Sequence, residues 1–104
     1  MSFAYLVIYK GQPENPDAFL RYYIDRHIPI VWTFPKIQAI QIHRDVDGGE
    51  FFMITRLIFD NLEDLRAAIT SEQRECARTD MQNFPPFCGN VHRQTVEILE
   101  MSRG

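Results

Sequence analysis

The chain has 104 residues, of which 45% are hydrophobic and 24% charged, and its formal net charge is −3 at pH 7. This length is typical of one domain with a modest core, and a negative charge without a basic block argues against nucleic-acid binding. The chain has no run of about 18 apolar residues, which excludes a membrane-spanning helix. We therefore expect one domain over residues 1–104 that binds neither nucleic acid nor membrane.

The start of the chain and its two cysteines indicate the compartment. Residues 1–5 (MSFAY) lack the basic region of a signal peptide and lead directly into a strand pattern. Cys76 and Cys88 have neither a CxxC nor a zinc-site spacing, and without an export signal they are expected to be reduced thiols. The sequence therefore predicts a cytoplasmic protein.

The first predicted element is a strand over residues 3–10 (FAYLVIYK), which are β-rich and alternate between two faces. Both faces are apolar, one mostly aromatic and the other aliphatic. Residues 11–16 contain glycine and prolines and are predicted to form a loop.

A helix is predicted to begin at Pro16, with Asn15 as its N-cap. At about 100° per residue, one side of this helix is charged and the opposite arc is apolar, with His27 at the centre of the arc. The other members of the arc are Phe19, Leu20, Tyr23, Ile24, Ile30, Val31 and Phe34. Pro29 removes one backbone donor, so the helix is expected to kink just after the histidine.

The rest of the chain alternates between strand and helix patterns. Strands are predicted over 37–45, 51–60 and 91–100, and helices over 62–69 and about 72–83. The Asp-Gly-Gly sequence at 47–49 is a turn between two of these strands, and Asn61 is expected to cap the helix that follows it. Prolines 85 and 86 and Gly89 are expected to break the chain before the last strand.

The order of these elements predicts an α+β domain of the ferredoxin-like kind, β-α-β-β-α-β, with four antiparallel strands and both helices on one face of the sheet. A sheet buried on one face alternates apolar with polar residues, whereas the first and third strands here are apolar on both faces. The second face must therefore be covered. A second copy of the same sheet would cover it, which predicts a homodimer that forms a dimeric α+β barrel.

Residues 19–29 (FLRYYIDRHIP) resemble the aromatic-rich motif ending in His-x-Pro of the EthD-like family, a branch of the dimeric α+β barrel superfamily. The resemblance runs from Tyr5 to Glu100. Further matching segments are Phe59-Asp60, residues 65–68 (LRAA), Ser71-Glu72, Asp80 and Asn83-Phe84. The chain departs from the family at Pro35-Lys36-Ile37, where Pro-Gly-Leu is usual. The family is named from a gene cluster for fuel-ether degradation, and the chemistry of its members is mostly undefined.

His27 is the first candidate for catalysis, because imidazole transfers protons at neutral pH and burial on an apolar face favours its neutral form. The resemblance implies that this histidine faces a cavity, while the alternative is a core histidine bonded to a backbone carbonyl. Tyr23 lies one turn earlier, within reach of His27 or of a ligand. It has its own alternative role as an aromatic anchor between helix and sheet, and Tyr22 is predicted to lie on the polar side.

Arg56 stands in an apolar strand, where an unpaired arginine is costly, so it is expected to reach an edge, pair with an acid or bind an anionic ligand. Together with Arg56, the apolar residues Phe19, Ile24 and Val31 are the predicted substrate-binding residues.

Other kinds of site receive less support from the sequence. His43 and His92, with the adjacent Arg44 and Arg93, are predicted to lie at strand ends or edges, and no histidine has a carboxylate cluster at metal-ligand spacing. Neither metal nor cofactor is expected: His27 could serve as an axial haem ligand, but nothing else indicates haem. Trp32 lies off the apolar arc, and with Asn61 and Asn83 it forms no convincing Trp-His-Asn triad of the kind found in some cofactor-independent monooxygenases of the superfamily.

The leading hypothesis is a cofactor-independent enzyme that binds a small hydrophobic or aromatic metabolite. His27 would act as general acid/base for an isomerisation, cyclisation, decarboxylation or oxidation, with Tyr23 and Arg56 orienting an oxyanion. The alternative is a non-catalytic accessory protein that holds a hydrophobic compound for a degradative oxygenase system.

Overall fold

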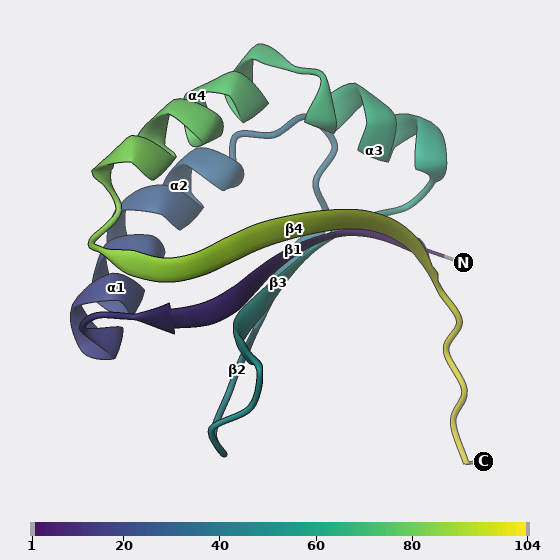
Figure 1. The fold of residues 1–104 in the computed structure, drawn as a ribbon. Helices are drawn as coiled ribbons and strands as arrows, with labels where there is room; N and C mark the ends of the chain where they lie inside the picture. The colour runs from purple at the N-terminus through teal and green to yellow at the C-terminus, as the bar shows by residue number, and fades with distance from the viewer. Residues whose placement is uncertain (1, 104) are drawn as a thin grey trace.

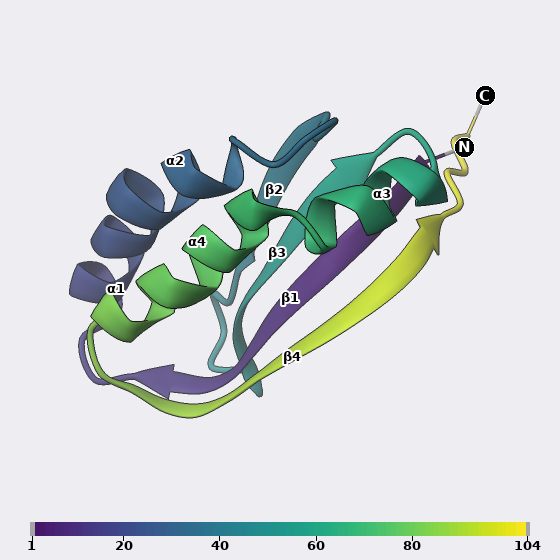
Figure 2. The same ribbon diagram turned by 90° about the horizontal axis from the view of Figure 1, so that it is seen from above.

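An antiparallel sheet carries the helices on one of its faces (Figures 1 and 2). In the computed structural model, which describes residues 2–103, the strands are β1 (Ser2–Pro13), β2 (Ala39–Arg44), β3 (Phe51–Phe59) and β4 (Phe87–Ile98). Their order in the four-stranded sheet is β2-β3-β1-β4. The helices are α1 (Pro16–Tyr22), the π-helix η1 (Tyr23–His27), α2 (Ile28–Val31), α3 (Leu62–Ile69), α4 (Glu72–Asp80) and the 3-10 helix η2 (Met81–Asn83). The ferredoxin-like α+β prediction is confirmed.

Side-chain caps fix where the helices begin. The Asn15 side chain accepts a hydrogen bond from the Ala18 amide at 3.1 Å, and the Asn61 side chain accepts one from the Asp64 amide at 2.8 Å. Each cap satisfies an amide that the first turn of a helix leaves without a partner. Both predicted N-caps are therefore confirmed.

The sequence predicted that Pro29 kinks the first helix just after His27. The distortion instead lies in the turn that ends at His27. The amide of Ile28 bonds to the carbonyl of Tyr23, five residues earlier, which makes residues Tyr23–His27 a π-helical turn. A proline lacks the amide that would bond four residues back, so the helix passes the proline by widening this turn. His27 and Tyr23 lie at the two ends of the widened turn.

Gly11 and Gly89 lie inside strands β1 and β4, whereas the sequence predicted a loop at Gly11 and a break in the chain at Gly89. They lie opposite each other in the β1–β4 pairing, which continues to Pro13 and Phe87. Their φ angles are 121° and 151°, and a Cβ on either would lie 2.0–2.2 Å from a carbonyl oxygen of the other strand. Only glycine fits two backbones that approach so closely, and the pair lets both strands run beyond the ends predicted from the sequence.

The sheet has one covered and one bare face, because directly paired residues of antiparallel strands share a face. The covered face carries Phe3, Tyr5, Val7 and Tyr9 of β1 and Met53, Thr55, Leu57 and Phe59 of β3, and their side chains pack with α1–α4 in two core clusters. The bare face carries apolar residues of three strands together with polar ones: Ala4, Leu6, Ile8, Ile54, Ile58, Val96 and Ile98, and Gln41, His43, Arg56, His92 and Gln94. The β2–β3 hairpin and the residues after β4 extend beyond the sheet on this bare side (Figure 1).

Candidate functional site

His27 and Asp80 form a buried pair between η1 and α4. His27 ends η1 and Asp80 ends α4, so residues 53 positions apart in the sequence meet with Nδ1 and Oδ2 2.9 Å apart. His27 is only 5% exposed and Asp80 only 9%. The sequence placed His27 on the buried arc, but Asp80 had no sequence signal beyond the family motif in which it stands.

Hydrogen bonds keep Asp80 ionised, because Tyr22 OH donates to its Oδ1 at 2.7 Å and the Asn83 amide donates to the same oxygen at 3.2 Å. Burial alone would raise the pKa of Asp80, but the hydrogen bonds from Tyr22, His27 and Asn83 outweigh it and hold that pKa below its usual range. The prediction that Tyr22 is an ordinary polar-side residue is wrong, since its hydroxyl reaches across to α4.

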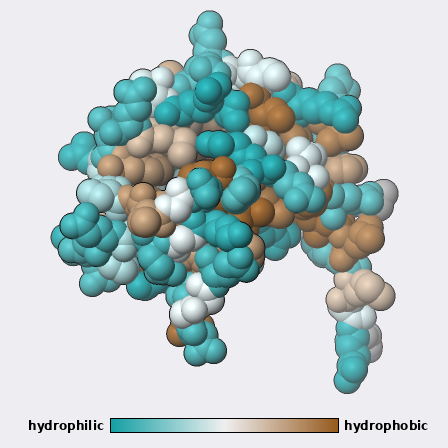
Figure 3. Space-filling view, in the orientation of Figure 1, coloured by the Kyte–Doolittle hydropathy of each residue, from teal (hydrophilic) through white to brown (hydrophobic). Residues whose placement is uncertain are grey.

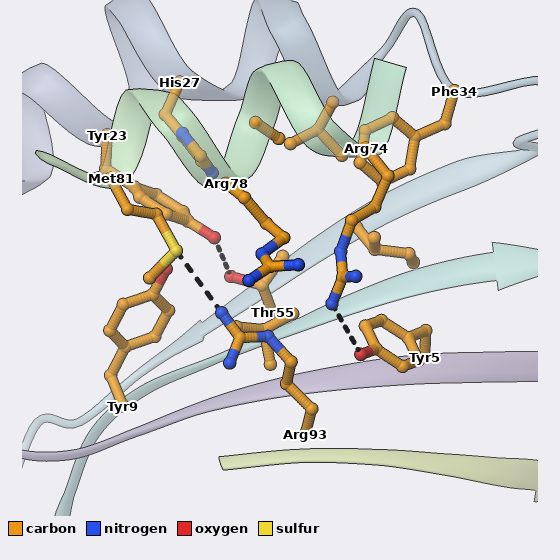
Figure 4. Close-up of a pocket in the computed structure, with 14 residues that line it drawn as sticks. Tyr5, Tyr9, Tyr23, His27, Phe34, Thr55, Arg74, Arg78, Met81 and Arg93 are labelled. Carbon is orange, nitrogen blue, oxygen red and sulfur yellow. Dashed lines mark hydrogen bonds between the residues drawn. The ribbon is translucent and has the colours of Figure 1, made fainter. Parts of the chain in front are cut away.

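The protonation of His27 follows from this pair. Burial lowers the pKa of His27, and the bond and charge of Asp80 offset this only in part, so the ring is neutral at pH 7. An ionised carboxylate accepts a hydrogen bond, so the proton of the neutral ring lies on Nδ1. Nε2 then carries a lone pair, and the ring points into a cavity (Figure 4).

Aromatic rings fix the orientation of His27. Tyr23 stacks on it with ring centroids 5.2 Å apart, and Phe84 meets it edge-on at 4.7 Å. The Tyr23 hydroxyl lies 2.7 Å from Thr55 Oγ1 on the sheet, so the bond of Tyr23 is to Thr55 and not to His27. Tyr23 is thus an aromatic support for the histidine, and its buried hydroxyl also lines the cavity.

The cavity lies between the covered face of the sheet and helices α2 and α4 (Figure 4). Its volume is ≈ 40 Å³, room for roughly three water molecules. The aromatic and aliphatic lining residues are Tyr5, Val7, Tyr9, Tyr23, Val31, Phe34, Leu57, Ala77 and Met81, and the polar ones are His27, Thr55, Arg74, Arg78 and Arg93. In the view of Figure 3, apolar atoms show between the helices and the sheet, with hydrophilic side chains around them.

Three arginines at the cavity were not singled out from the sequence. Arg74 and Arg78 come from α4, and Arg93 comes from the edge strand β4 on the other side (Figure 4). The sequence placed Arg93 among surface residues. The i,i+4 spacing of Arg74 and Arg78 is the signal that they share one side of a helix.

The structure brings only part of the predicted substrate-binding set to His27. Val31 lines the cavity, whereas Phe19 packs behind Tyr23 with ring centroids 6.4 Å apart. Ile24 is 50% exposed on the helix surface. It leaves the apolar arc because the π-helical turn changes the angle between successive residues.

Arg56 lies on the bare face of the sheet, opposite to the cavity. Its Nη1 donates a hydrogen bond to Gln41 Oε1 at 2.9 Å, and Gln41 stands directly across from it on β2. The hydrogen bond to the neutral Gln41 side chain therefore offsets part of the free-energy cost of a charged Arg56 in an apolar strand. The structure does not bring Arg56 and His27 into one site.

The remaining candidate groups lie outside the cavity. Trp32 is 51% exposed, and Cys76 and Cys88 are free and exposed. Within residues 2–103, no three His, Cys, Asp or Glu side chains are placed to hold a metal ion. In the same part of the chain, no helix has the length and apolar character needed to cross a membrane.

Comparison with known proteins places the fold. No known family profile matches the chain. The uncharacterized 11.0 kDa protein in the thcB-thcC intergenic region of Rhodococcus erythropolis is 24% identical over 83 residues, which cover 76% of this chain and 81% of that protein. The crystal structure of an EthD family protein from Bacillus halodurans matches with a TM-score of 0.80 at 20% identity, over 95% of this chain and 100% of that chain. This chain has the fold of an EthD family protein.

Two further solved structures share the EthD-like fold. SnoaB, a cofactor-independent oxygenase from Streptomyces nogalater, has a TM-score of 0.70 at 9% identity, over 96% of this chain and 95% of its own. A dimeric protein of unknown function and ferredoxin-like fold from Bacteroides fragilis has a TM-score of 0.66 at 13% identity, over 93% and 96% of the two chains. The predicted EthD-like fold is thus confirmed.

Proposed function

We propose that the cavity binds a small hydrophobic or aromatic molecule and that His27 is its general acid/base in a cofactor-independent reaction of the isomerase, cyclase, decarboxylase or monooxygenase type. The observation that carries this proposal is the 2.9 Å bond between His27 Nδ1 and Asp80, which leaves Nε2 as a proton acceptor on the cavity side. The fold that this chain shares with a cofactor-independent oxygenase supports the reaction class.

The pair performs a proton transfer as follows. Nε2 accepts a proton from a substrate C–H or O–H group, and the ring becomes an imidazolium while Nδ1 keeps its bond to Asp80. The Asp80 carboxylate then stabilises this positive charge at close range in a water-poor site. Tyr22 and Asn83 hold the carboxylate in place, so little reorganisation accompanies the transfer.

A ligand larger than the present space enters by displacing side chains at the mouth of the cavity. A volume of ≈ 40 Å³ is below that of an aromatic ring, whereas ligand sites usually reach several hundred cubic ångströms. Arg78 and Arg93 are exposed, and within residues 2–103 each makes one side-chain hydrogen bond, to Glu75 and to the sulfur of Met81 respectively. These two side chains can therefore change rotamer at a small cost in free energy.

The bare face supports a homodimer in which two sheets pack together as a dimeric α+β barrel. Leu6, Ile8, Ile54 and Ile58 of β1 and β3 form an apolar centre of this face, and an apolar patch of this kind marks an interaction surface. The dimeric description of one protein with this fold agrees with it. The free and exposed Cys76 and Cys88 fit a reducing compartment such as the cytoplasm.

The alternative is the non-catalytic accessory protein, favoured by the apolar cavity wall of Val31, Leu57 and Phe34, which can hold a hydrophobic compound without proton transfer. The variant His27→Ala separates the two functions, with Arg66→Ala on the exposed side of α3 as the control. A catalyst loses about 10²–10⁴-fold in turnover of a cavity ligand while its affinity is nearly unchanged. Unchanged turnover in His27→Ala contradicts the catalytic role of this residue, and a ligand that is bound but never turned over by the wild type supports the accessory protein.

A further inference from the structure

The polar lining of the cavity is positively charged. Arg74 and Arg78 point down from α4 and Arg93 points up from β4 into the same space (Figure 4). Within residues 2–103, none of the residues that line this cavity is acidic. Two carboxylates of α4 lie outside this lining: Asp80 bonds to His27, and Glu75 pairs with Arg78 at 3.3 Å in an exposed ion pair, where both side chains are more than half exposed.

Most hydrogen-bond donors of these arginines remain available. The Arg74 guanidinium donates to Tyr5 OH at 3.2 Å and to the Ile69 carbonyl at 3.5 Å. Arg93 donates to the Met81 sulfur at 3.3 Å, and a thioether is a weak acceptor. A guanidinium has five N–H donors, whose planar fork matches the two oxygens of a carboxylate. The site thus holds unused donors of the geometry that binds anions.

The spacing of the charges also favours an anion. Arginines four residues apart on a helix repel each other, as Arg74 and Arg78 do on α4. Arg93 brings a third positive charge from the facing strand, and it acts on the hydroxyls of Tyr9 and Tyr23, where it opposes the dominant effect of burial that raises their pKa. An anion between the three guanidinium groups would relieve this repulsion.

The opposite wall of the cavity is apolar and ends at His27. Val31, Phe34 and Leu57 line it together with the edge of the histidine ring. A molecule that touches both walls therefore needs an apolar body and a charged end. Its body would lie against the helix α2 and β3 side chains, and its charged end would lie at the α4–β4 mouth.

We propose that the ligand of this cavity is an apolar carboxylate whose anionic group is bound by Arg74, Arg78 and Arg93. This inference rests on the proposed small-molecule site and names the ligand class of that site.

The test compares acids with neutral amides of the same shape in the full chain. Benzoate with benzamide, phenylacetate with phenylacetamide, and naphthoate with naphthamide are titrated while the amide resonances of the cavity residues Thr55 and Ala77 are followed by NMR. We expect the best acid to bind about tenfold or more tightly than its amide, because hydrogen bonds to a charged group are stronger than those to a neutral one. Added salt should weaken the acid and leave the amide unchanged.

Variants assign the preference to the arginines. Arg78→Gln and Arg93→Gln replace exposed side chains and should each remove most of the advantage of the acid, while Arg78→Lys and Arg93→Lys should keep part of it because they keep the charge. Arg66→Gln, on the exposed side of α3, is the matched control and should change neither affinity.

The outcomes separate this inference from the proposed function. Equal binding of acid and amide at the cavity overturns the carboxylate inference and leaves the apolar ligand site standing. The same is true of an acid preference that survives in both glutamine variants. If no pair shifts the cavity resonances, the small-molecule site itself is contradicted and the inference falls with it.

Discussion

A polar side chain among apolar neighbours has a different kind of hydrogen-bond partner on the covered face of the sheet than on the bare face. On the covered side, His27 is closed off from water and bonded to an ionised partner, Asp80. On the bare side, Arg56 is bonded to the neutral amide of Gln41 among exposed and half-buried aliphatic side chains. The first arrangement sets the protonation of a ring beside a cavity, and the second gives a charged group a neutral partner among the aliphatic side chains of the bare face.

This difference shows why the two sides suit different tasks. Proton transfer needs a titratable group whose partner fixes its tautomer and whose free nitrogen reaches a ligand. Association of two sheets needs a broad apolar area without unpaired charge.

The largest effect is expected from a charge placed on the bare face. Ile58 lies on β3 between Ala4 and Ala39, with no cation directly across from it. The variant Ile58→Asp puts two unpaired carboxylates into the proposed dimer interface, which should weaken the dimer about a thousandfold or more. Sedimentation equilibrium of wild type and variant measures it.

Ile24→Asp is the matched control for this experiment, because Ile24 is half exposed on the helical layer. It should leave the dimer unchanged. A wild-type protein that stays monomeric at high concentration, or an Ile58→Asp variant that dimerises like wild type, contradicts the assignment of the bare face as the interface.

The next effect concerns the pair at the cavity. In Asp80→Asn, the negative charge that partly offsets burial is lost and only a neutral amide faces Nδ1, so the pKa of His27 should fall further and turnover of a cavity ligand should drop about tenfold or more. Titration of the histidine ring resonances by NMR measures the pKa. Asp25→Asn, an exposed change on η1, serves as control, and an unchanged or raised His27 pKa in Asp80→Asn is incompatible with the pair as described.

The sequence was sufficient for the order of elements and for the burial of His27, because alternation of apolar residues and capping residues such as Asn15 are local signals. It also put Val31 and Tyr23 beside the histidine. Asp80 and the cavity arginines could not be found in the same way. Their roles depend on how α4 docks against η1 and β4, and on a helix of polar composition such residues look like ordinary solvent-facing groups.

Each prediction that the structure corrected depends on a helix geometry or on a contact between distant segments that the local sequence does not show. Ile24 and the position of the helix distortion depend on a π-helical turn, which an angle of about 100° per residue does not anticipate. Gly11 and Gly89 lie in strands because they face each other, and pairing between distant strands is not visible in either segment alone. Arg56 was grouped with His27 since the sequence did not show which face each one occupies.

The stability of the fold should depend on pH through His27. Its pKa is lowered in the folded protein from its ordinary value of 6.5, so the unfolded chain binds more protons as the pH falls through that value. The stabilisation is therefore complete above about pH 6.5 and decreases on acidification. Asp80, whose pKa is also lowered, acts in the same direction at lower pH.

Urea unfolding at about pH 7.5 and about pH 5.5 measures this dependence. The free energy of unfolding should be lower at the acid pH, and His27→Gln should reduce the difference. An acid-stabilised wild type, or a dependence that persists in His27→Gln, would falsify this assignment.

The smallest effect is expected at the buried hydroxyl pair. Tyr23→Phe removes the 2.7 Å bond to Thr55 Oγ1 and should destabilise the protein by about 1 kcal/mol. Thr55→Val and the double variant complete a mutant cycle, whose coupling should be of the same size. Additive effects of the two changes would mean that the two hydroxyls do not interact.

The tautomer of His27 decides whether the ring can accept a proton from a ligand in the cavity. Long-range ¹H–¹⁵N NMR of the histidine rings at neutral pH measures this directly, with His27→Gln to assign the signal. We expect a neutral His27 with a protonated Nδ1 and an unprotonated, basic Nε2. A ring that is protonated on Nε2 alone, or that is doubly protonated at neutral pH, contradicts it.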